Sequence, residues 1–244
     1  MVVVNRHGTA CRAYIHNVDM SQYASEVAFE LGRALAEVKA MAGGSVSRVA
    51  GHRDSNVTVA GTYEKATEDA LAWAALDGAT EGCFALMFDG DTAGNAAYLG
   101  KIIISSDQIT AGDDAIKMPV QAFGVADVDR GISLHPLLER TSGASTTARD
   151  DRPAGTSSLG AQAYLNVTAI SAAAATLTVK IEHSTDNNTW ADLIAFTNVI
   201  SAGGPTSEKK ATATATTDVY RYIKVTWTIT NLKAATFFVG WKRN

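Results

Sequence analysis

The stretch Ala175-Thr176-Leu177-Thr178-Val179-Lys180-Ile181-Glu182-His183 alternates apolar and polar residues without interruption. In an extended chain Leu177, Val179 and Ile181 point to one face, and the polar residues between them point to the other. A helix would instead repeat its apolar positions every three or four residues. The period of two therefore predicts a β-strand with one buried face.

The sequence on either side of this strand repeats the same pattern. Residues 220–229 alternate again, with Ile223, Val225 and Trp227 on the expected inner face. Turn-forming clusters at 184–189 and 202–205 separate shorter alternating stretches. Six or seven short strands in this half predict an Ig-like antiparallel β-sandwich over residues 160–244.

Residues 139–159 carry no hydrophobic period and are rich in Ser, Thr, Gly and charge. Such a segment cannot bury a face, so it is interpreted as a linker. The chain is therefore predicted to comprise a first domain at 1–138, the linker, and the sandwich domain at 160–244.

The first domain is also predicted to be mainly β. Strand patterns occur at 10–15, 56–60, 82–88, 98–105, 116–123 and 131–137. Glu64 to Leu76 is the best candidate for a helix, with acidic residues in its first turn. Phe29 to Met41 is ambiguous, because good helix formers coexist with the strand-like alternation Val27-Phe29-Leu31.

No sequence pattern indicates catalysis, a metal site or a cofactor. The histidines His7, His16, His52, His135 and His183 lack metal-ligand spacing and are interpreted as surface or loop residues. Cys11 and Cys83 are expected to be free thiols. Nucleophile and phosphate-loop motifs are missing, so we expect a non-enzymatic protein. Trp190 follows a polar turn and is the candidate exposed aromatic for surface binding.

The charge of the chain is unevenly distributed. Residues 1–137 carry 17 acidic and 10 basic side chains, whereas residues 160–244 carry 5 acidic and 8 basic ones. An acidic domain is unsuited to binding DNA, because affinity for nucleic acid depends on neutralising phosphates.

The order of segments in the first domain resembles a known family. A strand at 11–15 leads to Asn17-Val18-Asp19-Met20-Ser21, a second strand follows at 27–30, and Arg48 to Asp54 precedes an alternating strand that ends at Gly61-Thr62-Tyr63-Glu64. This arrangement, over residues 10–137, is similar to the tail tube (major tail) proteins of long-tailed phages (siphophages). One departure is that residues 35–44 lack the Thr-rich phrase common in that family.

The resemblance implies a tail-tube-type β-sandwich or barrel with one flanking helix. It also implies hexameric rings of identical subunits that stack into a tube, through which DNA passes during ejection without specific binding. The loop from Arg33 to Arg53 would contact the next ring. Its charged residues are the candidate contact residues: Arg33, Glu37, Lys39, Arg48 and Arg53. Implied partners are further copies of the chain and other tail proteins, namely the tape measure, the terminator and the baseplate side.

The sandwich domain resembles accessory modules that decorate the exterior of phage particles, where it could contact a cell-surface glycan. The N-terminus has no secretory signal pattern, so assembly in the host cytoplasm is expected. The resemblance to tail tube proteins implies location in the virion tail. Two alternatives remain open: a capsid decoration or head-completion protein, and a carbohydrate-binding module.

Overall fold

The structure is a computed structural model that describes most of the chain. The described residues are 10–39, 46–62, 73–74, 76–77, 81–110, 116–125, 127–152, 155–171, 176–231 and 234–244. They form two compact units. The first comprises Met1–Gln22, Gly82–Gly100 and Asp129–Asn244, and the second comprises Tyr23–Glu81 and Lys101–Val128.

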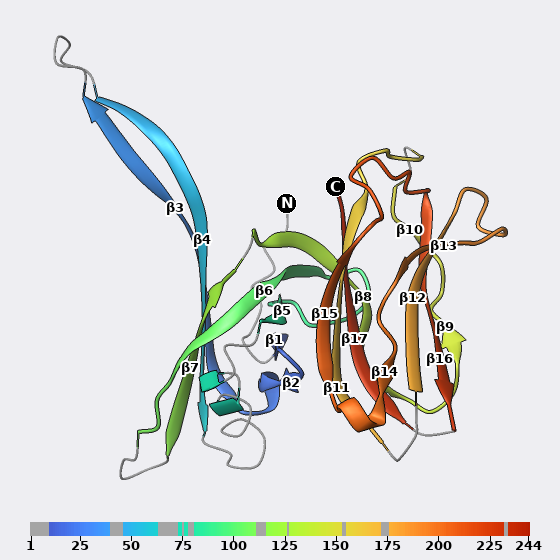
Figure 1. The fold of residues 1–244 in the computed structure, drawn as a ribbon, viewed down its shortest axis with the longest axis horizontal. Helices are drawn as coiled ribbons and strands as arrows, with labels where there is room; N and C mark the ends of the chain where they lie inside the picture. Colours follow the sequence, from blue (N-terminus) through green and yellow to red (C-terminus); the bar gives the residue numbers. More distant parts are fainter. Residues whose placement is uncertain are drawn as a thin grey trace. The chain divides into compact units, whose positions relative to one another are not determined.

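The first unit contains two antiparallel sheets (Figure 1). One has the strand order β15-β11-β17-β8-β6-β5-β1-β2, and the other the order β10-β16-β12-β13, with β9 joined to β16 and β14 to β12. The strands of the first sheet are β1 (Arg12–Ile15), β2 (Val18–Asp19), β5 (Gly82–Met87), β6 (Ala96–Asp107), β8 (Asp129–Arg140), β11 (Ala161–Ile170), β15 (Thr206–Ala211) and β17 (Ala235–Arg243). Those of the second are β9 (Ala144–Ser145), β10 (Arg149–Asp150), β12 (Thr176–Ser184), β13 (Ala191–Ala195), β14 (Val199–Ile200) and β16 (Tyr222–Thr230). Short 3-10 helices follow β2 (η2, Met20–Gln22) and β14 (η4, Ser201–Gly203).

Strands β11 and β17 contribute side chains to two hydrophobic cores. Leu165 and Phe237 pack with the second sheet, in a core that also contains Trp227. Their immediate neighbours Tyr164 and Phe238 belong to a separate core with residues of β1, β5 and β6. Because successive side chains of a strand point to opposite faces, one pair of strands forms a wall of both cores.

The second unit is a four-stranded antiparallel arrangement with the order β3-β4-β7-β6. Its strands are β3 (Ala24–Lys39), β4 (Val46–Thr62), β7 (Lys117–Gly124) and the later part of β6. The first two are long for strands, with 16 and 17 residues, and Figure 1 shows them as an extended curved ribbon.

The prediction of a mainly β protein with antiparallel sheets is confirmed. Strand β12 buries Leu177, Val179 and Ile181, and β16 buries Ile223 and Val225, as the alternation predicted. The helix expected at Glu64–Leu76 lies mostly outside the described residues. In this region the structure describes residues 73–74 and 76–77, which are helical. The helical alternative for Phe29–Met41 is wrong, because residues 24–39 form β3.

The predicted linker at 139–159 is also not what the structure shows. This segment contains the end of β8 and the strands β9 and β10, both of which pair with β16. Its polar composition is explained by contacts of its side chains, since Asp151 accepts hydrogen bonds from Arg243 and Trp241. The unit boundaries therefore differ from the predicted division at 138 and 160.

Candidate assembly surfaces

Among the strands that the structure describes, the distal half of the β3–β4 hairpin has no third strand beside it. Strand β4 pairs with β7 from Asn56 to Thr62, opposite Phe123 to Lys117. Among the strands that the structure describes, β3 pairs with β4 alone. Residues 33–39 and 46–53 therefore form a two-stranded ribbon that extends about 20 Å at ~3.3 Å per residue. Such ribbons are marginally stable in water unless something packs against them.

All five charged residues predicted for the contact loop lie on this ribbon, in β3 and β4 rather than in a loop. Arg33 is opposite Arg53 in the register, and Glu37 is opposite Arg48. A register shift between Arg33 and Leu35 marks a bulge at this point of the hairpin.

The sheet of the second unit has one buried and one exposed face near the root of the hairpin. Val57, Val59, Val120 and Ala122 are at most 2% exposed and share one face by register. The opposite face presents Glu26, Ala28 and Glu30 of β3, all exposed, beside Thr58 and Gln121. The face with Glu26 and Glu30 is therefore exposed and acidic, whereas the face with Val57 and Val59 is buried and apolar.

Trp190, predicted to be an exposed aromatic, is only partly exposed. The Lys224 ammonium lies 4.2 Å from the centroid of its ring, a cation–π arrangement. The turn before it is held by Asp186, whose carboxylate accepts hydrogen bonds from the backbone N–H groups of Asn188 and Thr189. These hydrogen bonds, Thr189 first, lower the pKa of Asp186.

A row of charged side chains continues from Trp190 across the second sheet of the first unit. Lys224 and Lys180 both contact the Glu182 carboxylate, at 3.2 and 2.8 Å, and Lys180 also reaches Asp192. Burial opposes ionisation of Glu182, but hydrogen bonds from Lys180, Thr226 and Lys224 outweigh it and hold its pKa at about 2. The row is a compensated charge network, typical of a solvated sheet face.

The most exposed tryptophan is Trp73, at 70%, which the sequence reasoning did not single out. It lies in the described helical turn at 73–74. Trp227 and Trp241 are buried, at 3% and 1%, as the core-packing interpretation of Trp227 predicted. Its neighbours in sequence, Leu71, Ala72, Ala74 and Ala75, are all apolar, so no local pattern marked Trp73 as exposed.

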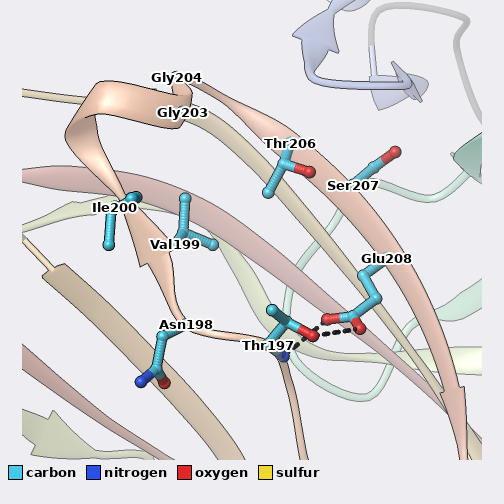
Figure 2. Close-up of a pocket in the computed structure, with 9 residues that line it drawn as sticks. All are labelled: Thr197, Asn198, Val199, Ile200, Gly203, Gly204, Thr206, Ser207 and Glu208. Carbon is cyan, nitrogen blue, oxygen red and sulfur yellow. Dashed lines mark hydrogen bonds between the residues drawn. The ribbon is translucent and has the colours of Figure 1, made fainter.

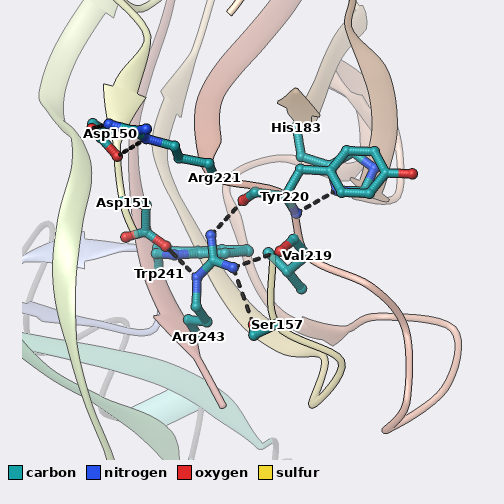
Figure 3. Close-up of polar contacts among 9 residues, drawn as sticks. All are labelled: Asp150, Asp151, Ser157, His183, Val219, Tyr220, Arg221, Trp241 and Arg243. Carbon is teal, nitrogen blue, oxygen red and sulfur yellow. Dashed lines mark hydrogen bonds and ion pairs between the residues drawn. The ribbon is translucent and has the colours of Figure 1, made fainter. Parts of the chain in front are cut away.

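Within the first unit, Arg243 holds the segment that follows β8 through several hydrogen bonds (Figure 3). Its guanidinium donates to the Asp151 carboxylate, to the Ser157 hydroxyl and to the carbonyls of Val219 and Tyr220. The Asp151 and Arg243 side chains are about one-tenth exposed. Arg221 and Asp150 form a second, exposed ion pair nearby. The arrangement is a structural clamp on the segment at 149–157.

A shallow cavity of about 380 Å³ lies between β14, η4 and β15 (Figure 2). Its ionisable lining residue, Glu208, accepts hydrogen bonds from the backbone N–H and the hydroxyl of Thr197, both at 2.8 Å. Lys210 lies 3.3 Å from the same carboxylate. The Glu208 carboxylate is therefore held by contacts within the protein.

Three histidines expected at the surface are buried: His16, His135 and His183. His135 stacks on Phe237 at 4.5 Å between ring centroids, and its Nε2 accepts a hydrogen bond from Arg140. Burial lowers the pKa of His135 to about 4. His135 thus packs against the core that contains Phe237, a contact that sequence spacing alone could not reveal.

Neither Cys83, which is buried, nor Cys11, which is partly buried, forms a disulfide in the structure. Among the described residues no group of three or more His, Cys, Asp or Glu side chains could hold a metal ion. No helix in the described part of the chain is both long and apolar enough to cross a membrane.

The architecture defines a mainly β protein with an extended two-stranded arm. A scan against protein-family models and a search of curated proteins gave no match. Among solved structures, a chain from the virion of a native gene transfer agent particle matches with 12% identity and a TM-score of 0.41, covering 52% of this chain and 98% of that one. A chain from the tail of an empty gene transfer agent particle with C6 symmetry gives the same values.

The Dit protein of SPP1, described as a paradigm of the hub adsorption apparatus in phages that infect Gram-positive bacteria, is also similar. It has 11% identity and a TM-score of 0.29, with 96% of this chain and 99% of that chain covered. Identities of 11–12% and TM-scores below 0.5 are low, so the function proposed below rests on the geometry and sequence of this chain.

Proposed function

We propose that this chain is a non-enzymatic structural subunit of a phage tail. Copies of it close into rings, and the rings stack into the tail tube through which DNA passes. The β3–β4 hairpin carries this proposal, because it is a long ribbon whose distal half has no described third strand. The resemblance of the segment order at 10–137 to tail tube proteins supports the same role.

The two-faced sheet of the second unit suits the wall of a water-filled channel. Its apolar face, with Val57, Val59 and Val120, is buried, whereas its acidic face with Glu26 and Glu30 is exposed. A conduit for DNA benefits from acidic walls, since carboxylates repel phosphates and keep the duplex from adhering. We therefore assign the Glu26 and Glu30 face to the lumen.

The edge of β3 supports ring formation. Among the described strands β3 pairs with β4 alone and so lies at an edge of its sheet. An edge strand is a template for pairing with another chain. Pairing of this edge with a different part of a neighbouring copy is a heterologous contact, which forms a ring when the rotation closes.

Negative-stain electron microscopy of the purified protein at increasing concentration tests the proposal. Tubes or stacked rings with a central hole are the expected result. Single closed rings that never stack would indicate a terminal ring of a tail instead of the tube. Particles without a central hole, or monomers at every concentration in the presence of preformed tube seeds, would contradict the proposal.

A further inference from the structure

A cavity of about 300 Å³ lies in the first unit, where strands β8 and β17 meet the segment that follows β10. Residues 130–132, residues 241–243 and Asp151 line it. Ile132 and Trp241 are register partners on neighbouring strands, so their side chains share one face of the first sheet. Both pack in the core between the two sheets. The cavity therefore has one apolar wall.

The charged groups of the cavity are unequally matched. The Asp151 carboxylate accepts a hydrogen bond from Nε of Arg243 at 2.7 Å (Figure 3). The Lys242 ammonium is paired with Asp129 at 2.9 Å. The third cation of the lining, Arg130, is exposed and has no ion-pair partner among the residues that the structure describes. The cavity therefore has one cation without a counter-ion.

A second guanidinium at the same end of the unit also lacks a counter-ion. Arg149 is half-buried, and its Nε is buried without a hydrogen-bond partner in the described part of the chain. Its Nη1 lies so close to Gly94 that an added Cβ there would be 2.4 Å away. The N–H of Gly94 donates to the carbonyl of Ser133, the residue after Ile132 of the cavity wall. Two unmatched arginines favour the binding of an anion, because hydrogen bonds between a guanidinium and an anion are strong.

An aromatic pair borders Arg130. Tyr98 of β6 is the register partner of Arg130, so the two side chains are neighbours on one face of the sheet. The Phe88 ring meets Tyr98 edge to face, with 5.9 Å between ring centroids, and is 41% exposed. An exposed aromatic ring can pack against the apolar C–H face of a sugar. A guanidinium can bind a carboxylate or a phosphate through paired hydrogen bonds.

We infer that the cavity and the aromatic pair form a binding site for an acidic glycan. The sugar ring packs on Phe88 and Tyr98, and its carboxylate or phosphate binds Arg130 at the cavity. The site differs from the one predicted at Trp190, whose ring is covered by Lys224. It adds a binding activity to the proposed tail role and requires one chain, so it stands or falls separately from ring formation.

Titration of defined sugars into the dilute full-length chain, followed by NMR, tests the site. The charged probes are trigalacturonic acid and glucose 6-phosphate, and their neutral counterparts are the methyl ester of the first and glucose. We expect a charged sugar to bind roughly tenfold more tightly than its neutral counterpart. Binding of trigalacturonic acid alone identifies a carboxylate ligand, and binding of glucose 6-phosphate alone identifies a phosphate ligand. Absence of binding, or equal binding of the neutral sugars, would overturn the inference.

Two variants locate the site. Arg130→Gln should weaken binding about tenfold, because it removes the charged hydrogen-bond donor. Phe88→Ala should weaken it about fivefold, because it removes the exposed ring. The matched control is Arg221→Gln, since Arg221 also lies beside a tyrosine, 5.0 Å from the centroid of Tyr222, but is paired with Asp150. Its binding is expected to equal that of the wild type.

Thermal denaturation by circular dichroism verifies that each variant is folded. An Arg130→Gln chain that is folded and binds as tightly as the wild type would overturn the assignment. So would equal losses in Arg130→Gln and Arg221→Gln, because the attraction would then be a general effect of charge. Loss of binding in Trp190→Ala with Phe88→Ala unaffected would place the glycan at Trp190 and contradict the inference.

Single-stranded nucleic acid is the other ligand class that aromatic rings and arginines bind together. Competition with an oligo(dT) strand separates the two classes. Retention of the sugar in the presence of equimolar oligo(dT) supports the glycan assignment. Displacement of the sugar by oligo(dT) under these conditions would overturn it in favour of a nucleic-acid site.

Discussion

The strands of the two units differ in how completely they are packed and paired within the chain. In the first unit β11 and β17 are buried on both faces, with Leu165 and Phe237 in one core and Tyr164 and Phe238 in another. In the second unit the distal part of β3 and β4 has no neighbour among the described strands except each other. The contrast supports the proposal that the second unit is completed by association with another copy of the chain.

Truncation after residue 138 should produce the largest effect. The fragment would lack β11 and β17, which form a wall of both cores of the first unit. We expect no cooperative thermal transition in circular dichroism. A soluble fragment 1–138 that melts cooperatively would show that the first domain is independent of the rest, as the sequence division at 138 supposed.

Truncation of a single core side chain should have the second-largest effect on stability. Phe237 is fully buried, so Phe237→Ala should cost about 3–5 kcal/mol in the free energy of unfolding. The matched change on the hairpin, Leu31→Ala, removes a side chain that is 47% exposed and should cost less than about 1 kcal/mol. Urea denaturation of both variants measures the difference. Equal losses would contradict the contrast between the units.

The clamp on the segment at 149–157 predicts an intermediate effect. Arg243→Ala leaves the Asp151 carboxylate about one-tenth exposed without its ion-pair partner, at a cost of about 3 kcal/mol. Arg221→Ala removes an exposed pair with Asp150 and should leave stability essentially unchanged. If limited proteolysis cut the 149–157 segment equally in both variants, the clamp would have no role.

The smallest predicted effect depends on pH. His135 has a pKa of about 4 in the folded protein and about 6.5 when unfolded, so above pH 6.5 both states are neutral and the stability is complete. As the pH falls from 6.5 to 4 only the unfolded state gains the proton, which lowers the free energy of unfolding by roughly 2–3 kcal/mol.

Buried His16 and His183 also have lowered pKa values and act in the same direction. His135→Gln should therefore flatten the stability profile between pH 6.5 and 4 without abolishing its slope. Chemical denaturation at each pH provides the measurement. An unchanged slope in the variant would show that His135 is not a main source of the acid sensitivity.

Local patterns of the sequence were sufficient for most strands. The alternation of Leu177, Val179 and Ile181 predicted β12 because burial on one face is a property of the strand itself. The ambiguous stretch Phe29–Met41 could not be resolved in that way, since its helix formers compete with the alternation. Pairing with β4 along the chain decided it in favour of a strand.

Contacts distant in sequence were beyond the reach of local patterns. The segment 139–159 resembled a linker because its polar residues lack a period, yet Asp151 is bound by Arg243, 92 positions away. The five predicted contact residues do lie on one hairpin, as strands instead of a loop. Trp190 was expected to be exposed, but Lys224 of β16 lies over its ring, a neighbour that no local reading could supply.

Amide hydrogen exchange of residues 33–39 and 46–53, compared between dilute and assembled protein, tests the central claim most directly. Fast exchange is expected in the dilute protein and strong protection after assembly, while the amides of β11 and β17 are protected in both. Protection of the ribbon already in the dilute protein would contradict it, because the arm would then be complete without a partner. Fast exchange in the assembled protein would contradict it equally, since the arm would take no part in the contact.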